Sequence, residues 1–179
     1  MVETAIGVRT VIEDFAGSAL CDGRILASNS GRCVEASYPI AYNLGAGKCR
    51  WPGWINVNFG DDADLKADLR DLSMIPSDSA DAVAAIHVLE HFYEWEAFNL
   101  LTEWKRILKP GGAMILELPC MDKVFNYIAK CVEAGEAPLS FMTTHAIYGD
   151  PKHRDPLMCH KWGWFGQSLK ELLEQVRFS

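Results

Sequence analysis

Residues 41–58 read AYNLGAGKCRWPGWINVN. A short apolar strand is predicted over residues 40–44, and a second strand over residues 55–58. The turn between them contains Gly45 and Gly47. Glycine has no Cβ, so a ligand can come close to the main chain at such a turn. Because ligands of open parallel sheets bind outside the carboxyl ends of the strands, this stretch predicts a small-molecule site.

Residues 82–118 continue the same pattern. The apolar run 82–88 is typical of a strand that is buried on both faces. Apolar residues at helical spacing predict an amphipathic helix over 94–108, which Pro110-Gly111-Gly112 is expected to end. A further buried strand is expected over 113–118. This order predicts an α/β fold, a Rossmann-like, doubly wound and mainly parallel sheet.

Other segments give weaker patterns. A third strand is expected over residues 64–69, and helices over 124–134 and 168–176, the last with Ser168 as its N-cap. In residues 1–39, the spacing of apolar residues is compatible with one face of a short helix formed by Ile6, Val8, Val11, Ile12 and Phe15.

Composition limits the function classes. The chain has 179 residues, 49% hydrophobic and 23% charged, as expected for one globular domain. The net charge of -7 disfavours a broad nucleic-acid surface. No apolar run approaches the ~20 residues of a membrane helix, and the N-terminus lacks a secretory pattern, so a cytoplasmic protein is expected. None of the 6 cysteines forms a C-x-x-C pair, so no zinc ribbon is expected, and without an export signal reduced thiols are expected over a disulfide framework.

The glycine turn is unsuited to a dinucleotide. Residues 48–53 leave no room for a regular helix before the next strand, so a pyrophosphate would lose the backbone N–H groups that it needs. A nicotinamide cofactor is therefore disfavoured. A ligand with a sulfonium and a ribose but no phosphate has no such requirement.

The long segment 138–166 is rich in histidine and aromatic residues. The spacing of His145, His153 and His160 matches no compact metal motif, so no metal is expected. We expect instead a lid-like loop that closes over the site, with Tyr148, His160 and Trp162 facing the substrate.

Five segments together resemble the class I S-adenosylmethionine-dependent methyltransferases, in the branch of predicted methyltransferases with a Methyltransf_11-like core. They occur in the family's order, and the resemblance covers roughly residues 40–178. The segments are Asn43–Gly47, Gly53–Asn58, Asp68–Leu72, His87–His91 and Leu108–Gly112.

The resemblance implies S-adenosylmethionine as the cofactor and assigns roles by position. Gly45 and Gly47 would bound its methionine part, Asn58 would face the ribose, Asp68 and Leu69 would hold the adenine, and His87 and Val88 would line the floor near the reactive methyl. Asn43 and Ala46 complete the expected cofactor site. A hydroxyl acceptor would also need a general base, for which the candidates are His91, His145 and His160.

Two departures from the family pattern leave two functions open. Asn58 stands where the family usually has Asp, and the sequence ends at Ser179, where two further strands should begin. The sheet is thus expected to lack its last one or two strands, and the exposed edge would favour a homo-oligomer. The first function is methyl transfer to a small-molecule acceptor. The second is a non-catalytic binding or assembly module.

The resemblance also implies the organisation of the chain. We expect one methyltransferase-like domain over residues 1–179. It would comprise an N-terminal extension over 1–39, a cofactor-binding core over 40–120 and the lid-like loop over 138–166. Neither a nucleic acid nor a membrane is expected as a partner.

Overall fold

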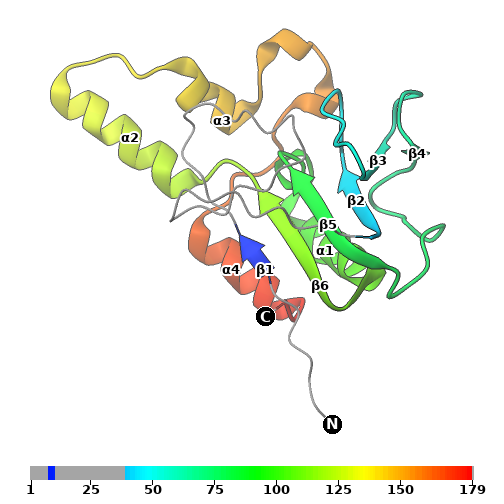
Figure 1. The fold of residues 1–179 in the computed structure, drawn as a ribbon. Coiled ribbons are helices and arrows are strands. Elements are labelled where there is room, and N and C mark those ends of the chain that lie inside the picture. The colour runs from blue at the N-terminus through cyan, green and yellow to red at the C-terminus, as the bar shows by residue number, and fades with distance from the viewer. Residues whose placement is uncertain (1–7, 11–38, 179) are drawn as a thin grey trace.

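The computed structural model describes residues 8–10 and 39–178. Its centre is one six-stranded sheet with the order β1-β6-β5-β2-β3-β4, in which every pairing is parallel (Figure 1). The strands are β1 (Val8–Thr10), β2 (Ala41–Leu44), β3 (Ile55–Asn58), β4 (Leu65–Lys66), β5 (Ala80–Ile86) and β6 (Leu108–Glu117). The expected Rossmann-like parallel sheet is confirmed.

Helices and short 3-10 turns connect and extend the strands. The longer helices are α1 (Glu94–Ile107), α2 (Met121–Ala134) and α4 (Gly166–Gln175). The shorter elements are η1 (Leu89–His91), η2 (Ser140–Met142), α3 (Thr144–Tyr148), η3 (Pro151–His153) and η4 (Pro156–Met158). No helix in residues 8–10 and 39–178 is both long enough and apolar enough to cross a membrane.

The strand order reverses between β2 and β5. The chain runs outward from β2 through β3 to β4, then returns to place β5 on the other side of β2. Crossovers on either side of such a point diverge and leave a crevice at the carboxyl ends of the strands. The segments that follow β2 and β5 are therefore placed side by side at the position expected for a ligand.

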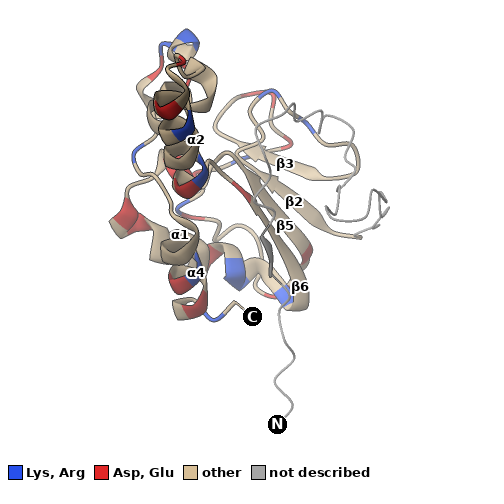
Figure 2. Ribbon diagram, turned by 90° about the vertical axis from the view of Figure 1, so that its left-hand side faces the viewer, with Lys and Arg blue, Asp and Glu red and all other residues tan. Residues whose placement is uncertain are grey.

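Helices α1 and α4 lie on one side of the sheet (Figure 2). Side chains alternate between the faces of a strand, so neighbouring residues of β5 and β6 enter different clusters. Val83 and Met114 join the large core beneath the helices, whereas Ala84 and Ile115 pack with Trp51 on the opposite face. Among the described residues, the helices thus cover one face only.

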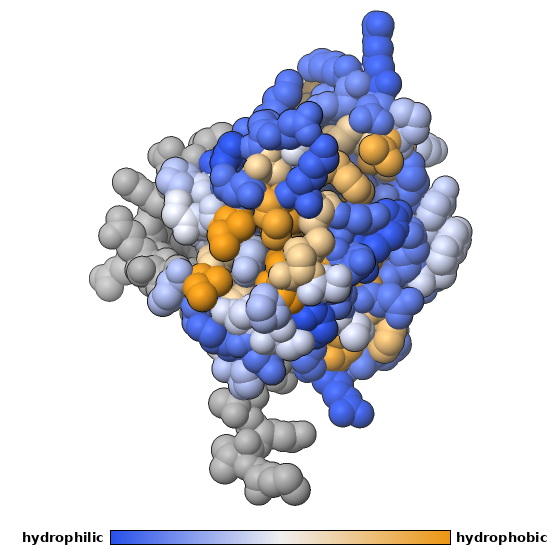
Figure 3. Space-filling model, turned by 90° about the vertical axis from the view of Figure 1, so that its right-hand side faces the viewer, coloured by the Kyte–Doolittle hydropathy of each residue, from blue (hydrophilic) through white to orange (hydrophobic). Residues whose placement is uncertain are grey.

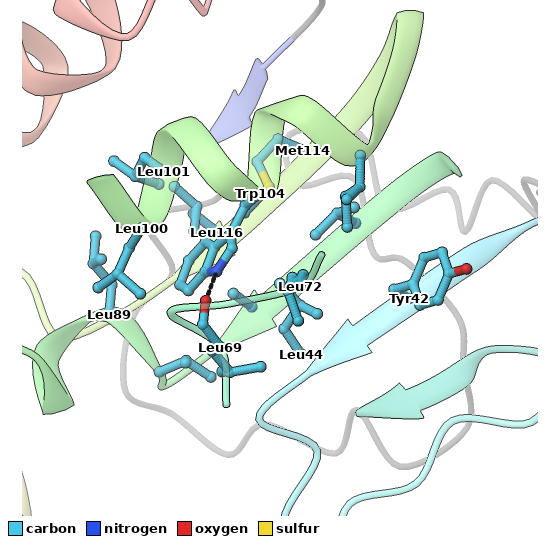
Figure 4. Close-up of a cluster of buried hydrophobic side chains, with 14 of the residues drawn as sticks. Tyr42, Leu44, Leu69, Leu72, Leu89, Leu100, Leu101, Trp104, Met114 and Leu116 are labelled. Atoms are coloured by element: carbon cyan, nitrogen blue, oxygen red, sulfur yellow. Dashed lines mark hydrogen bonds between the residues drawn. The ribbon is translucent and has the colours of Figure 1, made fainter. Parts of the chain in front are cut away.

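Trp104 of α1 is the centre of the large core. Its side chain is fully buried, and the indole Nε1 donates a hydrogen bond of 3.0 Å to the carbonyl oxygen of Leu69 (Figure 4). A buried indole N–H needs such a partner. The bond therefore fixes the segment after β4, which approaches the carboxyl edge of the sheet, onto helix α1.

The strong sequence patterns correspond closely to the observed elements. The strands expected over 40–44, 55–58 and 82–88 are β2, β3 and β5, and the helix expected over 94–108 is α1. The helix expected over 124–134 is α2, which begins three residues earlier, at Met121.

Several boundaries differ from expectation. The third strand is only Leu65–Lys66. Strand β6 begins at Leu108, which pairs with Ala80, and the register then shifts before Ala113 pairs with Ala82. The N-cap of α4 is Phe165, and Ser168 lies in its first turn, with its Oγ bonded to the Phe165 main chain.

The N-terminal segment also departs from the predicted pattern. Residues 8–10 form strand β1, not part of a helix, and the rest of that proposed helix lies outside the described residues. Strand β1 pairs with β6 over three residues and covers the edge of β6. The edge that was expected to be exposed is therefore occupied over these three residues, and the homo-oligomer stays a prediction.

Candidate active site

The turn after β2 lies tightly against Val88, the second residue after β5. Gly45 and Gly47 have positive φ angles of 65° and 51°, a conformation that glycine adopts without strain. A Cβ on Gly45 would lie 2.6 Å from Cγ2 of Val88. Gly45 is therefore required by this close approach as well as by its backbone angle.

A cavity of about 310 Å³ lies at this edge of the sheet. Six of the residues expected to bind the cofactor line it, together with one of the three candidate bases. These are Gly45, Gly47, Asn58, Leu69, His87 and Val88, with His91 as the candidate base. Sequence positions that are 46 residues apart thus converge on one volume, because the strands that carry them are parallel neighbours.

Three of the expected cofactor residues do not line the cavity. Asn43 is buried, and its side-chain amide donates to the carbonyl oxygen of Cys49 and to Oδ1 of Asn56, both at 3.0 Å. Ala46 is buried in the turn. The carboxylate of Asp68 accepts a hydrogen bond from the backbone N–H of Arg70.

The segment 138–166 reaches the cavity through residues that sequence reasoning missed. Its contributions are Asp155, Leu157 and Met158, at and within η4. Tyr148 is 69% exposed, and neither it nor His160 or Trp162 lines the cavity. The sequence did contain a usable pattern, because Pro156-Leu157-Met158 is a short apolar run in a polar stretch.

The end of this segment is fixed to the turn after β5. The backbone N–H groups of Lys161 and Trp162 both donate to the carbonyl oxygen of Glu90, at 2.7 and 3.3 Å. This anchors the end of the segment next to η1.

The face on the β3 and β4 side carries a group of hydrophobic side chains among hydrophilic ones (Figure 3).

His87 sits between two carboxylates at the end of β5. Its φ of 53° is left-handed, an unusual value for a residue with a Cβ. Nδ1 lies 3.2 Å from Oε1 of Glu90, and Nε2 lies 3.4 Å from Oε1 of Glu117. Burial opposes the charge, but bonding to Glu117 and Glu90 outweighs it and raises the pKa of His87 to about 10. His87 is therefore a cation at neutral pH, at the wall of the cavity.

A second group of titratable side chains lies beside the first. The donor atoms of Glu90, His91 and His160 all lie within 4.8 Å of one another. Glu90 is buried. Burial of the His160 ring lowers the pKa of His160, which favours its neutral form. His145 and His153 are not members of this group. The three histidines of segment 138–166 therefore do not form one cluster. His160 instead lies near Glu90 and His91, in the turn after β5.

Comparison with known proteins identifies the fold. The family model for the methyltransferase domain matches residues 51–116. A SAM-dependent methyltransferase from Archaeoglobus fulgidus aligns with a TM-score of 0.53 at 19% identity, over 78% of this chain and 60% of that protein. The chain therefore has the class I methyltransferase fold. The resemblance expected from the sequence is confirmed at that level.

Two further structures have the same methyltransferase fold. One is a SAM-dependent methyltransferase from Thermotoga maritima, described as a possible histamine N-methyltransferase, with a TM-score of 0.50 at 14% identity over 79% of this chain and 64% of that one. The other is the small RNA methyltransferase HEN1, with a TM-score of 0.50 at 13% identity over 79% of this chain and 19% of that one. No curated protein matches the sequence. This methyltransferase-fold chain spans about 60% of the length of the Archaeoglobus protein.

Proposed function

We propose that this chain transfers a methyl group from S-adenosylmethionine to a small-molecule acceptor. The observation that carries the proposal is the cavity between the ends of β2 and β5, because the cavity lies at the reversal point of a sheet with the class I methyltransferase fold. Its volume of about 310 Å³ is at the lower end of the range for small-molecule sites.

The residues at the cavity fit a phosphate-free adenosyl ligand. The turn at Gly45 and Gly47 leaves main chain uncovered, which suits the methionine part. The amide of Asn58 can hydrogen-bond a ribose hydroxyl, and Ala67 and Leu69 offer apolar contact for an adenine ring. When bound, S-adenosylmethionine would supply the electrophilic methyl carbon.

The chain's own contribution is positioning and exclusion of water. A neutral sulfide leaves in such a transfer, so correct alignment of donor and acceptor is the main requirement. His91 is the candidate base that the cavity contains, whereas His145 and His160 lie outside its lining. We therefore assign proton removal from a hydroxyl acceptor to His91. The net charge of -7 supports a small molecule over a nucleic acid.

The test is calorimetric titration with S-adenosylhomocysteine, the demethylated product. Asn58→Ala should weaken binding roughly fivefold, and Asn58→Asp should tighten it by a similar factor, because a charged acceptor makes a stronger hydrogen bond. Asn99→Asp, on the exposed surface of α1, is the matched control and should leave binding unchanged.

Two results would count against this function. The absence of binding at millimolar product would favour the non-catalytic binding or assembly module. Equal effects of Asn58→Asp and Asn99→Asp would show that Asn58 does not contact the ligand.

A further inference from the structure

A buried carboxylate with one unused oxygen lies at the end of β5. Glu90 is 1% exposed, and within residues 8–10 and 39–178 its Oε2 has no hydrogen-bond partner. The other oxygen, Oε1, is 3.2 Å from Nδ1 of His87. Burying a carboxylate oxygen without a partner is costly. The position of Oε2 therefore suits a cation or a hydrogen-bond donor.

The two neighbouring imidazoles have their Nδ1 atoms on backbone carbonyls. Nδ1 of His160 is 2.9 Å from the carbonyl oxygen of Ala146, and Nδ1 of His91 is 3.3 Å from that of Cys159. A carbonyl oxygen can only accept, so each Nδ1 carries the hydrogen. In the neutral rings, each Nε2 then keeps its lone pair. Metal-binding histidines are oriented in this way, by a hydrogen bond from the nitrogen that does not bind the metal.

We propose that Glu90, His91 and His160 form a binding site for a divalent first-row transition metal, with Zn²⁺ as the best fit. Their donor atoms lie within 4.8 Å of one another, and Nε2 of His160 is 4.0 Å from Oε1 of Glu90. Zinc bonds of ~2.0–2.2 Å in a tetrahedron require donor separations of roughly 3.4 Å, so donor atoms up to 4.8 Å apart must approach by up to about 1.4 Å. Two imidazoles also favour such metals over Mg²⁺ and Ca²⁺, which prefer oxygen.

The backbone already holds the three side chains in place. Glu90 and His91 are adjacent in η1, and the N–H groups of Lys161 and Trp162 donate to the carbonyl oxygen of Glu90. The backbone N–H of His160 donates to the carbonyl oxygen of Tyr148 at 3.2 Å. Segments that are 70 residues apart are thus joined beside the site, so little order has to be created when an ion binds.

The ion would lie beside the cavity, because His91 belongs to both. Three protein ligands leave at least one position of a tetrahedral ion for water or for an oxygen or nitrogen of the acceptor. The Nε2 lone pair of His91 can bind the ion or remove a proton, but not both, so the role of His91 as a base applies to the metal-free chain. The site itself does not depend on the proposed methyl transfer, since metal binding can be measured without any adenosyl ligand.

The test is a titration of the full, EDTA-treated chain with Co²⁺, followed by its visible absorption, and with Zn²⁺ by calorimetry. The wild type should bind one equivalent of metal. Glu90→Gln and His91→Gln should each weaken binding by at least about tenfold. His153→Gln is the matched control, because His153 is exposed and outside the group, and it should bind as the wild type does.

Unfolding measurements on the same variants separate lost ligands from lost structure. Zn²⁺ should raise the unfolding temperature of the wild type and of His153→Gln but leave that of Glu90→Gln unchanged. If Glu90→Gln does not fold, metal binding by His91→Gln alone tests the site, because His91 is only partly buried and its substitution should leave the fold intact. A wild type without stoichiometric binding, or ligand variants that bind as tightly as His153→Gln, would overturn the proposal. Binding of S-adenosylhomocysteine is a separate titration, so either proposal can fail alone.

Discussion

Gly45→Ala is the substitution that most directly tests the contact between the two strand ends. The new methyl group would stand 2.6 Å from Cγ2 and 3.2 Å from Cγ1 of Val88. Crowding of this kind costs about 1–3 kcal/mol. The φ of 65° adds roughly 1–2 kcal/mol for a residue with a Cβ. We therefore expect Gly45→Ala to lower the free energy of unfolding by about 2–5 kcal/mol.

Gly53→Ala is the matched control. Gly53 has a φ of 78°, but a Cβ built on it meets no atom within 4 Å. Only the backbone cost of roughly 1–2 kcal/mol then applies. Urea unfolding followed by circular dichroism measures both values, and the difference between the two variants isolates the steric part. In thermal unfolding, each kcal/mol should shift the midpoint by about 2–4 °C for a chain of this size.

The contact partner provides a second check. Val88→Ala removes both methyl groups that the new side chain would meet, so in the double variant the steric cost should largely disappear. The coupling free energy between positions 45 and 88 should be about 1–3 kcal/mol. The reasoning is refuted if Gly45→Ala costs no more than Gly53→Ala, or if the two sites are additive.

Two further predictions concern the core and the charge of His87. Trp104→Phe removes the N–H that donates to the carbonyl oxygen of Leu69, and urea unfolding should show a loss of about 1–3 kcal/mol for the buried acceptor alone, in addition to lost packing. His87→Asn keeps a residue that tolerates a positive φ but removes the cation between Glu90 and Glu117. The pKa of His87 is about 10 in the folded protein against 6.5 for an unperturbed histidine, so its stabilising effect is complete below pH 6.5 and is lost as the pH rises towards 10. In EDTA, the stability difference between wild type and His87→Asn should shrink over that range, and a constant difference would contradict the assignment.

The regular elements were predictable because their patterns are local. The apolar run that became β5 is buried on both faces, and the helical spacing in α1 matches a helix that packs on one side of the sheet. The glycine turn could also be predicted, since glycine is the residue that most readily adopts the positive φ angles found at Gly45 and Gly47. Together with the family resemblance, these features named seven of the fourteen residues that line the cavity.

The hydrogen bonds of Asn43 were harder to predict from the sequence, although Asn43 and Asn56 are both polar residues within predicted strands. Asn43 and Asn56 are direct partners in the register of β2 and β3, so their amides meet inside the sheet. A single sequence shows two polar residues in two short strands, but the register that pairs them depends on the whole sheet. Asn43, which was expected to contact a cofactor, donates to the carbonyl oxygen of Cys49 and to Oδ1 of Asn56.

Glu90 shows the limit of local reasoning most clearly. In the sequence it is an acid near the start of a helix, where solvent exposure is the usual state. In the structure it is buried because the backbone at Lys161 and Trp162 folds over it, with His160 alongside. No pattern within a few residues encodes a contact across 70 positions. The same long-range contact that buries the carboxylate also supplies the second imidazole, so one folding event creates both the cost of an unpaired oxygen and the ligand set that could offset it.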